Sequence, residues 1–497
     1  MAPRYPVSIV WLRRDLRLDD NVALLRAAEA SERVVCAFVL DPALLRGPRV
    51  GAPIVQFFFE SLAALRSALR ARHSDLALLE GDAANELLAL AERTGAPAVF
   101  FNEDYDPSAI DRDARVARTL RGAAIDVHAH TDHVYFGAAD VLQSDGRPYV
   151  VYTPYRRRWH LWFTAEPRAP VASAPALRNK LMPRAVVGAT RDVPRTEEYG
   201  HVTSEAYPRG GLDEAKRLLD EFLTGGLTRY AERRNTPSLD GTSRLSPHLR
   251  AGTIGIRTVV HAAAWVRANA PDRDAREADG WIGELVWRDF YQQLLFHHPR
   301  VAHEPFREAA AAIAHANDDA AYAAWCEGRT GYPIVDAAMT QLNATGWMHN
   351  RLRMIAASFL TKHLLTDYRR GERYFEQHLA DADLAANNGG WQWSASTGTD
   401  AAPYFRVFNP VLQGYTFDPD GTFVKRIIPA LAKLPPKYVH APWTTPPLLQ
   451  AQLGCVIGRD YPEPIVDHAF ARDRAIAVYG AVLGRSAMAG PRRPVKT

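Results

Sequence analysis

Cysteine is scarce in this sequence, with three residues, Cys36, Cys326 and Cys455, in a chain of 497. They are odd in number and far apart, which argues against a disulfide framework, a zinc ribbon and a CxxC redox pair. We therefore expect three reduced thiols, as in a cytosolic protein.

Long hydrophobic runs are also missing. No window reaches the roughly 18 to 20 apolar residues of a membrane span, and the N-terminal stretch MAPRYPVSIVWLRRDL holds no apolar run of signal-peptide length. The sequence therefore predicts a soluble protein of the cytoplasm without a membrane partner.

Lysine is rare, and the net charge is small. Only seven of the 60 basic residues are Lys, which leaves 53 Arg, and 56 acidic residues reduce the net charge to +4. This charge permits an acidic partner without requiring one, because a basic genomic composition also enriches arginine. With 47% hydrophobic and 23% charged residues, the composition is that of a globular chain of two or three domains.

Residues 7 to about 135 alternate short apolar runs with helical patterns. The runs are VSIVWL, VVCAFVLD, LALLEGD, AVFFNEDYD and IDVHAH, and the helical patterns include 53–72, 108–121 and a helix opened by Asp19-Asp20-Asn21. This order is typical of a doubly wound parallel sheet, which binds ligands beyond the carboxyl ends of its strands. The loops there contain neither GxGxxG nor a GxxxxGK phosphate loop, which disfavours a dehydrogenase or a P-loop enzyme.

The rest of the chain changes character twice. Residues 136–205 are rich in proline and are typical of a long interdomain connector, whereas residues 206–480 show helical periodicity almost throughout. We expect an α/β domain over 1–135, the connector, an all-helical domain over 206–480 and a flexible tail over 481–497.

The helical pattern GWIGELVWRDFYQQLL carries a mixed face. At about 100° per residue, an arc of about 120° holds Trp281, Glu284, Trp287, Arg288 and Tyr291. An unpaired charge on a core face costs several kcal/mol. Considered alone, Glu284 is expected to form a structural ion pair with Arg288. Because two tryptophans share the same face, we favour a polar and aromatic cavity.

The stretch HNRLRM places two candidate residues on one helical face. Asn350 and Met354 are four residues apart, with Arg353 adjacent and Arg351 turned away. The simpler interpretation is a partly solvated helix with two surface arginines.

Two further polar stretches allow more than one interpretation. Asp381-Ala382-Asp383 fits a helix-capping acidic pair or a DxD metal site, and we expect no metal because no His or Cys cluster accompanies it. In GTSRLS, Thr242, Ser243 and Arg244 offer an anion site, and Ser246 is expected to be the N-cap of a helix. Capping alone is the commoner explanation.

Trp391 and Trp393 stand in NNGGWQWSASTG, which has few aliphatic residues to bury them. The simplest interpretation is a loop whose tryptophans plug the core.

Together these motifs resemble the DNA photolyase and cryptochrome family, most closely the class I cyclobutane pyrimidine dimer photolyases. The similarity covers nearly the whole chain, through WLRRDLRLDDN, GTSRLS, ELVWRDFY, GYPIVDAAMTQL, GWMHNRLRM and DADLAANNGGWQWSASTGTDAAPYFRVFNP. It implies an α/β antenna domain and a helical domain that holds FAD. The reduced FAD would donate an electron to a cyclobutane pyrimidine dimer in damaged DNA under near-UV or blue light, in a monomeric enzyme.

The resemblance implies roles around FAD for two sets of residues. The phosphates and ribityl chain would be held by Tyr230, Thr242, Ser243, Arg244, Leu245 and Ser246, and the flavin would be surrounded by Trp281, Arg288, Arg353, Asp381, Asp383 and Asn387. Asn387 would face flavin N5, where cryptochromes commonly carry Asp or Cys, so this residue favours a photolyase.

The resemblance also implies a pocket for the flipped-out dimer, lined by Glu284, Trp287, Asn350, Met354 and Trp393. The two tryptophans would hold the pyrimidines, and Glu284 and Asn350 would bind their polar edge. The (6-4) photolyases are expected to carry histidines in the HNRLRM region; His349 is outside the matching positions, so we expect it to be structural. Arg234, Arg351 and Arg406 match positions that bind DNA phosphates.

The family usually passes an electron inward to the flavin along three tryptophans. Here the matching positions hold Trp391, Tyr368 and His315. Tyrosine is harder to oxidise unless its proton leaves, and histidine is a poor relay, so Trp325, Tyr322 or Tyr374 stay open as substitutes.

The antenna and two functional alternatives also stay open. Folate-binding members carry an Asn-Glu pair where this chain has Ser108 and Ala109, which favours a deazaflavin or an empty antenna site over folate. A flavin photoreceptor and a (6-4) photolyase are the alternatives; Asn387 opposes the first and the lesion-pocket residues oppose the second.

Overall fold

The computed structural model describes residues 3–188 and 190–484. The chain forms two compact units. Unit 1 contains Met1–Tyr230, Thr242–Pro299 and Ala380–Ala385, and unit 2 contains Ala231–Gly241, Arg300–Leu379 and Ala386–Thr497. The boundaries predicted at 135 and 205 follow changes of local pattern and stay predictions, because compactness groups the sheet with several later helices.

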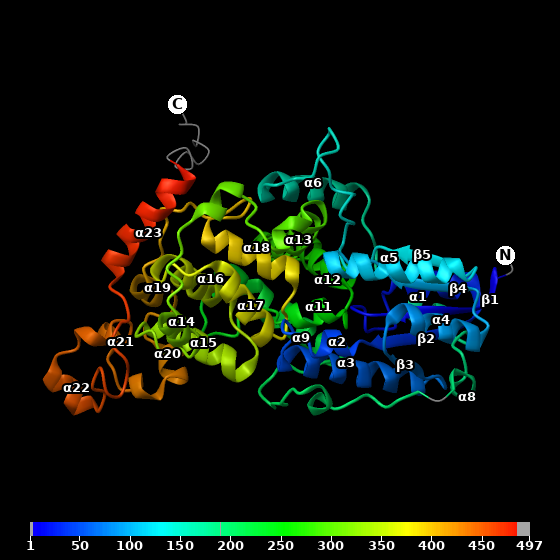
Figure 1. Ribbon diagram of the computed structural model, residues 1–497, viewed down its shortest axis with the longest axis horizontal. Helices are drawn as coiled ribbons and strands as arrows, with labels where there is room; N and C mark the ends of the chain where they lie inside the picture. The colour runs from blue at the N-terminus through cyan, green and yellow to red at the C-terminus, as the bar shows by residue number, and fades with distance from the viewer. Residues whose placement is uncertain (1–2, 189, 485–497) are drawn as a thin grey trace. The chain divides into compact units, whose positions relative to one another are not determined.

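Unit 1 is built around a parallel sheet of five strands in the order β3-β2-β1-β4-β5 (Figure 1). The strands are β1 (Tyr5–Leu12), β2 (Ser31–Leu40), β3 (Leu76–Glu80), β4 (Ala98–Asn102) and β5 (Asp126–His130). The strand order reverses between β1 and β4, which confirms the predicted doubly wound sheet.

Helices follow the strands as the periodicity predicts. They are α1 (Val22–Ala30), α2 (Pro42–Leu45), α3 (Ala52–Arg70), α4 (Ala83–Thr94) and α5 (Pro107–Gly122). The core on one face of the sheet packs strand residues such as Ile9 and Val99 against Leu87 and Leu90 of α4 and Leu120 of α5.

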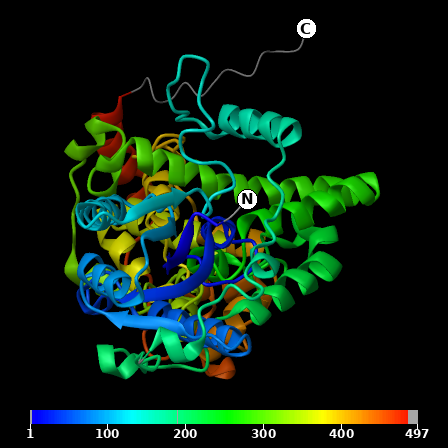
Figure 2. The ribbon, with the colours of Figure 1, turned by 90° about the vertical axis from the view of Figure 1, so that its right-hand side faces the viewer.

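The predicted connector contains more helix than its proline content suggests. It holds α6 (Tyr152–Ala165), α7 (Ser173–Ala176), α8 (Arg184–Val187) and the 3-10 turn η1 (Thr196–Tyr199), and Figure 2 shows it from cyan to green. Buried Trp159 of α6 donates its indole N–H to Asp289, at 3.1 Å. This segment is therefore packed into unit 1.

The later helices of unit 1 are α9 (Leu212–Glu221), α11 (Ser246–Ala251), α12 (Ile256–Asn269) and α13 (Asp272–His297), with η2 (Phe222–Gly226) and η3 (Leu227–Arg229) after α9. Helix α10 (Tyr230–Arg233) begins in unit 1 at Tyr230 and continues in unit 2. One prediction is wrong here. Ser246 is the first residue of α11, and the N-cap is Leu245, which has no side-chain cap bond.

Unit 2 is helical. Its longer helices are α14 (Asp319–Cys326), α15 (Pro333–Thr345), α16 (Asn350–Ser358), α17 (Tyr368–His378), α18 (Leu384–Ala395), α19 (Pro410–Phe417) and α23 (His468–Leu483); the π turn η6 (Phe359–His363) follows α16. Shorter elements are η4 (Pro299–Ala302), η5 (Glu308–Ala312), α20 (Thr422–Ile427), η7 (Pro429–Leu431), α21 (Pro436–Val439), η8 (Pro442–Thr444) and α22 (Pro447–Leu453).

The structure differs from two expectations for unit 2. Trp391 and Trp393 lie on α18 and not in a loop. Of the predicted tail, residues 481–483 belong to α23, and 485–497 lie outside the described residues.

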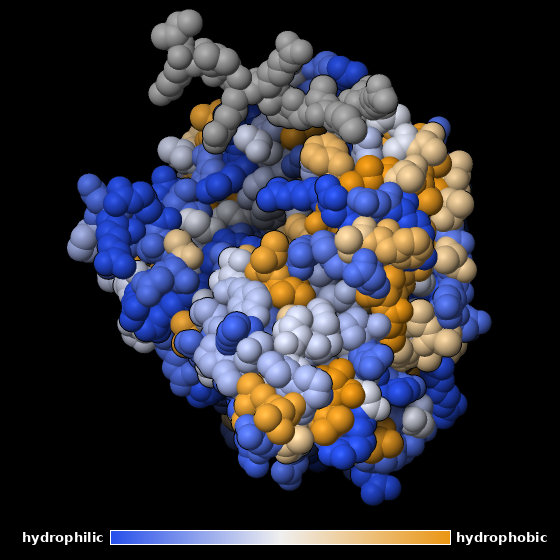
Figure 3. Space-filling model, turned by 90° about the vertical axis from the view of Figure 1, so that its left-hand side faces the viewer, coloured by the Kyte–Doolittle hydropathy of each residue, from blue (hydrophilic) through white to orange (hydrophobic). Residues whose placement is uncertain are grey.

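Hydrophobic and hydrophilic residues are mixed on the face that Figure 3 shows. Among residues 3–188 and 190–484, no helix is both long and apolar enough to cross a membrane.

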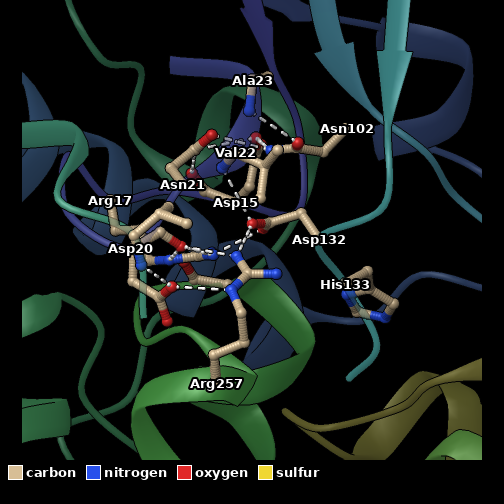
Figure 4. Close-up of polar contacts among 12 residues, drawn as sticks. Asp15, Arg17, Asp20, Asn21, Val22, Ala23, Asn102, Asp132, His133 and Arg257 are labelled. Carbon is tan, nitrogen blue, oxygen red and sulfur yellow. Dashed lines mark hydrogen bonds and ion pairs between the residues drawn. The ribbon is translucent and has the colours of Figure 1, made fainter. Parts of the chain in front are cut away.

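A buried polar network joins the ends of β1, β4 and β5 to α12 (Figure 4). Asp132, which follows β5, accepts hydrogen bonds from Arg17 at 2.6 Å, from the Val22 amide at 3.2 Å and from Arg257 of α12. Arg257 also donates to Asp20 at 2.9 Å. All four charged side chains are at most 5% exposed.

A second set of bonds in the same network holds the end of β4. The amide of Asn102 donates to Asp15 at 2.7 Å and to Asn21 at 2.9 Å, and its oxygen accepts from the Ala23 amide at 3.0 Å. Asn21 in turn caps α1 by accepting from the Leu24 amide. These bonds provide partners for polar groups that would be costly to bury alone.

Two glycines allow the chain to approach this network. A Cβ at Gly252, where φ is 68°, would lie 2.0 Å from the Arg14 carbonyl oxygen, and one at Gly255 would lie 1.9 Å from Asp20 Oδ2. The close approach of α12 to the strand ends therefore requires glycine at both positions.

We predict that Arg257→Met lowers the free energy of unfolding by about 3–5 kcal/mol, because it leaves Asp20 and Asp132 buried with fewer cationic partners. The measurement is urea denaturation followed by tryptophan fluorescence. The matched control, Arg267→Met on the exposed side of α12, should change stability by less than about 0.5 kcal/mol. Equal effects of the two substitutions would contradict the prediction.

Candidate functional site

The mixed face predicted for α13 is confirmed. Ile282, Leu285, Val286 and Phe290 are at most 6% exposed. On the predicted face, Trp281 is buried, and half-buried positions are held by Glu284, Trp287, Arg288 and Tyr291. The helix therefore turns its aliphatic residues into the core and leaves a carboxylate and aromatic rings partly open.

Trp287 is held by an aromatic neighbour from the predicted connector. Its ring stacks on Tyr152 of α6 with centroids 3.5 Å apart and planes at 7°, and Tyr291 lies 5.4 Å away. The Tyr152 hydroxyl donates to the Gly283 carbonyl of α13 at 2.6 Å. The stacking on Tyr152 thus covers one face of the Trp287 ring and holds the ring in place.

Arg288 is directed toward the end of β5. It donates to the His133 carbonyl at 2.6 Å and to the Leu249 carbonyl at 3.3 Å, and it contacts the His133 ring at 2.7 Å. Burial lowers the pKa of Arg288, and the nearby Asp383 opposes that shift. The guanidinium is therefore anchored by backbone oxygens of unit 1.

Asp383 lies at the centre of a buried charge cluster in unit 1. Its carboxylate accepts from Arg14 and, at 2.9 Å, from Gln292, and His133 Nε2 is 3.9 Å away. Burial alone would raise the pKa of Asp383, but Arg14 and His133 hold it well below its usual value. The structure thus shows Asp383 in a buried ion pair with Arg14, directly before α18, and Asp381 is also buried. The two interpretations of Asp381-Ala382-Asp383, a capping pair and a metal site, stay predictions.

The pKa values of His133 and Asp106 in this cluster shift in opposite directions. Burial and the charges of Arg288 and Arg14 lower the pKa of His133 to about 3. Burial and Asp104 raise the pKa of Asp106 to about 7. Arg14, Asp106 and His133 were not predicted as site residues; their only signal in the sequence is a position just after a predicted strand.

The GTSRLS turn of unit 1 presents open polar side chains. Thr242 and Ser243 are half-buried, Arg244 and Ser246 are exposed, and Leu245 is buried at 1%. Arg244 has φ of 52°, a left-handed conformation that is uncommon outside glycine and occurs often at ligand clamps. Tyr230, predicted for the same site, is 6% exposed.

The predicted residues of α16 lie on its open side. Asn350 is exposed, and Arg353 and Met354 are half-buried. Arg353 donates to the Met348 carbonyl at 2.9 Å. His349 is the N-cap of α16, and its ring accepts a hydrogen bond from the Arg351 amide at 3.1 Å.

Helix α18 places one tryptophan inside and one partly outside. Trp391 is 2% exposed, and its buried indole N–H has no hydrogen-bond partner among the described residues. A Cβ at Gly371 of α17 would lie 2.1 Å from this ring. Trp393 is half-buried, and the side-chain amide of Asn387 donates to the Glu372 carbonyl at 3.0 Å.

Two predicted arginines of unit 2, Arg234 and Arg406, lie close enough to Arg351 for their charges to act on it. Burial lowers the pKa of Arg351, and the charges of Arg234 and Arg406 lower it further. Arg351 donates to Asn235 at 2.8 Å, and its guanidinium lies 4.4 Å from the centroid of the Phe417 ring. Arg351 is thus oriented by neighbours and held beside like charge, an arrangement that favours a bound anion.

Tyr368, the second position of the predicted relay, is poorly placed for proton release. Tyr368 is 4% exposed, and its hydroxyl is buried without a hydrogen-bond partner in the described structure. Burial lowers the pKa of His315.

Comparison with known proteins gives matches over almost the entire chain. Residues 8–175 match the family model described as DNA photolyase, and residues 281–481 match the FAD binding domain of DNA photolyase. A deoxyribodipyrimidine photo-lyase of Halobacterium salinarum is 41% identical over 490 residues, which cover 96% of this chain and 100% of that protein.

Solved structures agree. A bacterial class III photolyase from Agrobacterium tumefaciens superposes with a TM-score of 0.87 at 37% identity, covering 97% of this chain and 99% of that one. An archaeal photolyase from Sulfolobus tokodaii with two FAD molecules has a TM-score of 0.80 at 31% identity, covering 96% and 100%.

We predict that His133 makes the protein less stable as the pH falls. Below pH 6.5, the pKa of an unfolded histidine, the unfolded chain binds a proton at His133, whereas the folded chain binds it only near pH 3. The free energy of unfolding should therefore fall by about 2–3 kcal/mol between pH 6.5 and 4.5. His133→Gln should remove that part of the slope in denaturation curves recorded across this range. His303→Gln, at an exposed site, controls for losing an imidazole; an unchanged slope in His133→Gln would refute the assignment.

Proposed function

Because this chain belongs to the DNA photolyase family, we propose that it is a light-driven enzyme that splits cyclobutane pyrimidine dimers in damaged DNA. The observation that carries the proposal is the half-open face of α13, where Glu284 stands beside the stacked ring of Trp287. A carboxylate next to a large flat ring suits a ligand with a polar edge and an apolar body, which describes a pyrimidine dimer.

The residues present fit FAD as the cofactor. In unit 1, the open hydroxyls of Thr242 and Ser243 and the strained Arg244 suit its phosphates. In unit 2, the buried indole N–H of Trp391 lacks a partner among the described residues. When bound and reduced, FAD supplies the electron that opens the dimer.

The remaining cofactor residues are assigned by their matching positions. We assign Tyr230, Leu245, Ser246, Trp281, Arg288, Asp381 and Asp383 of unit 1, and Arg353 and Asn387 of unit 2, to FAD binding. The side-chain amide of Asn387 donates to the Glu372 carbonyl, which orients the Asn387 side-chain oxygen so that it can accept a hydrogen bond from a ring N–H.

The dimer must leave the duplex before these residues can hold it, and its poor stacking reduces the cost of flipping by a few kcal/mol. We assign Glu284 and Asn350 to hydrogen bonds with the carbonyl and N–H edge of the dimer. We assign Trp287, Trp393 and Met354 to contacts with its apolar rings.

Arg234, Arg351 and Arg406 are assigned to phosphates beside the dimer. Phosphate contacts give affinity and register without reading sequence, which suits an enzyme that repairs damage wherever it occurs. We further propose that the protein acts as a monomer in the cytoplasm. The Sulfolobus relative, which holds two FAD molecules, supports a second chromophore here; its class, deazaflavin or folate, is decided by extraction and chromatography.

The test is repair by chemically reduced, FAD-loaded protein of an oligonucleotide carrying one cyclobutane dimer, in blue light and in the dark. We expect dimer loss in the light only. Glu284→Gln should lower the yield of repair and leave FAD content unchanged. Bound FAD without repair of this substrate would favour the photoreceptor, and repair of a (6-4) lesion alone would favour the (6-4) photolyase.

We predict that Arg351→Ala weakens DNA binding and lowers the slope of log affinity against log salt concentration by about 1, because one phosphate contact is lost. Binding is measured by fluorescence anisotropy at several salt concentrations. The control, Arg373→Ala on the exposed side of α17, should keep the parent slope. A parent-like slope in Arg351→Ala would remove Arg351 from the DNA interface.

A further inference from the structure

Trp391 contacts a second buried tryptophan that leads away from the positions expected for the relay. Its ring centroid lies 6.1 Å from that of Trp325, at an interplanar angle of 71°. Trp325 is fully buried and donates its indole N–H to the Ala356 carbonyl at 3.1 Å. Two adjacent indoles, fixed in closely packed surroundings within unit 2, are the arrangement that rapid electron hopping requires.

Two half-buried tyrosines extend this contact toward solvent. Tyr374 lies 5.6 Å from Trp325 and Tyr322 lies 6.1 Å from it, measured between ring centroids. The path from Trp391 through Trp325 therefore reaches the surface in one further step by either tyrosine.

The surroundings of the two tyrosines differ in charge. The Arg370 guanidinium lies 4.0 Å from the centroid of the Tyr322 ring, and the Tyr322 hydroxyl donates to the Arg370 carbonyl at 3.2 Å. A cation over a ring opposes the removal of an electron from that ring. Tyr374 instead stacks on His378, with centroids 3.9 Å apart.

Tyr374 also has a route for its proton. Its hydroxyl lies within hydrogen-bond distance of two acceptors, the Asn343 side-chain oxygen at 2.8 Å and the Cys326 carbonyl at 3.0 Å, and Asn343 is exposed to solvent. The hydroxyl of Tyr368, by contrast, is buried and has no hydrogen-bond partner in the described residues. Oxidation of Tyr368 would therefore leave a charged phenol in an apolar site, which is costly.

We infer that photoreduction of the cofactor in this protein runs through Trp391, Trp325 and Tyr374. The inference rests on the proposed function only in placing the flavin beside Trp391. Trp391 gives one electron to the light-excited flavin, Trp325 gives one to Trp391, and Tyr374 gives one to Trp325 while its phenolic proton passes to water. A thiol in solution then returns one electron and one proton to Tyr374.

The test uses FAD-loaded protein with oxidised flavin, excited by a blue laser pulse, with radicals followed by transient absorption. We expect the parent protein to form a tryptophanyl radical that is replaced by a neutral tyrosyl radical. Tyr374→Phe should abolish the tyrosyl signal and leave the tryptophanyl radical. Trp325→Phe should abolish the tyrosyl signal and slow steady photoreduction by thiol several-fold.

Tyr368→Phe is the matched control, since it makes the same change at the second position of the predicted relay and should leave the tyrosyl signal intact. Loss of the signal in Tyr368→Phe with retention in Tyr374→Phe would overturn the inference, and loss in Tyr322→Phe alone would overturn the choice of Tyr374. FAD content and the unfolding midpoint verify that each variant is folded.

The outcome is separable from that of the proposed function. Chemically reduced Trp325→Phe and Tyr374→Phe should repair dimers at the parent rate, because repair by reduced FAD bypasses the relay. If the chemically reduced parent fails to repair dimers, the proposed function fails, while the radical measurements still decide the relay.

Discussion

The pairing of Arg257 with Asp20 and Asp132 is the interaction on which unit 1 depends. Charges this deeply buried are stable only when every lone pair and N–H has a partner, and here Arg17, Val22 and Thr258 provide the remaining bonds. The network gathers the ends of three strands and the start of α12 at one point. It explains why the α/β sheet and helices far along the chain form one compact unit.

The same end of the sheet orients the proposed cofactor residues. Arg14, which follows β1, pairs with Asp383, and His133, which follows β5, receives Arg288 from α13. Two residues assigned to FAD are thus positioned by loops of the sheet, in agreement with the rule that doubly wound sheets place ligands beyond their strand ends. Through Arg14 and His133, the sheet contributes to the chemistry of a site whose named residues come from helices.

Local patterns allowed much of the fold to be predicted from sequence. The pattern IRTVVHAAAWVRAN coincides with α12, and the mixed face of α13 is half-open as its periodicity requires. Helix α18 was not predicted because Asn387-Asn388-Gly389-Gly390 has low helix propensity, and tertiary contacts such as the Asn388 bond to Glu372 override it. Ser246 was wrongly predicted to be an N-cap because it stands directly before a proline, which is common at the first position of a helix.

Site residues that stand in contiguous motifs were predicted from the sequence. Residues whose partners are distant in the sequence were missed. Arg234, Arg351 and Arg406 were assigned by resemblance, and the structure brings the charges of Arg234 and Arg406 close enough to act on Arg351. Nothing local marks Arg14 as the partner of Asp383, 369 residues away. The contact of Trp325 with Trp391 likewise depends on how α14 packs against α18, which periodicity does not encode.

Gly371 shows how a backbone position can control an aromatic ring. Its φ is not in the left-handed region, so any residue could adopt its backbone conformation. Its Cβ position is nevertheless occupied by the far edge of the Trp391 indole, with Leu360 close behind. A single methyl group there would push the indole away and change its separation from Trp325 and Phe375. The absence of a side chain at one position of α17 therefore determines where the ring of a residue on α18 lies.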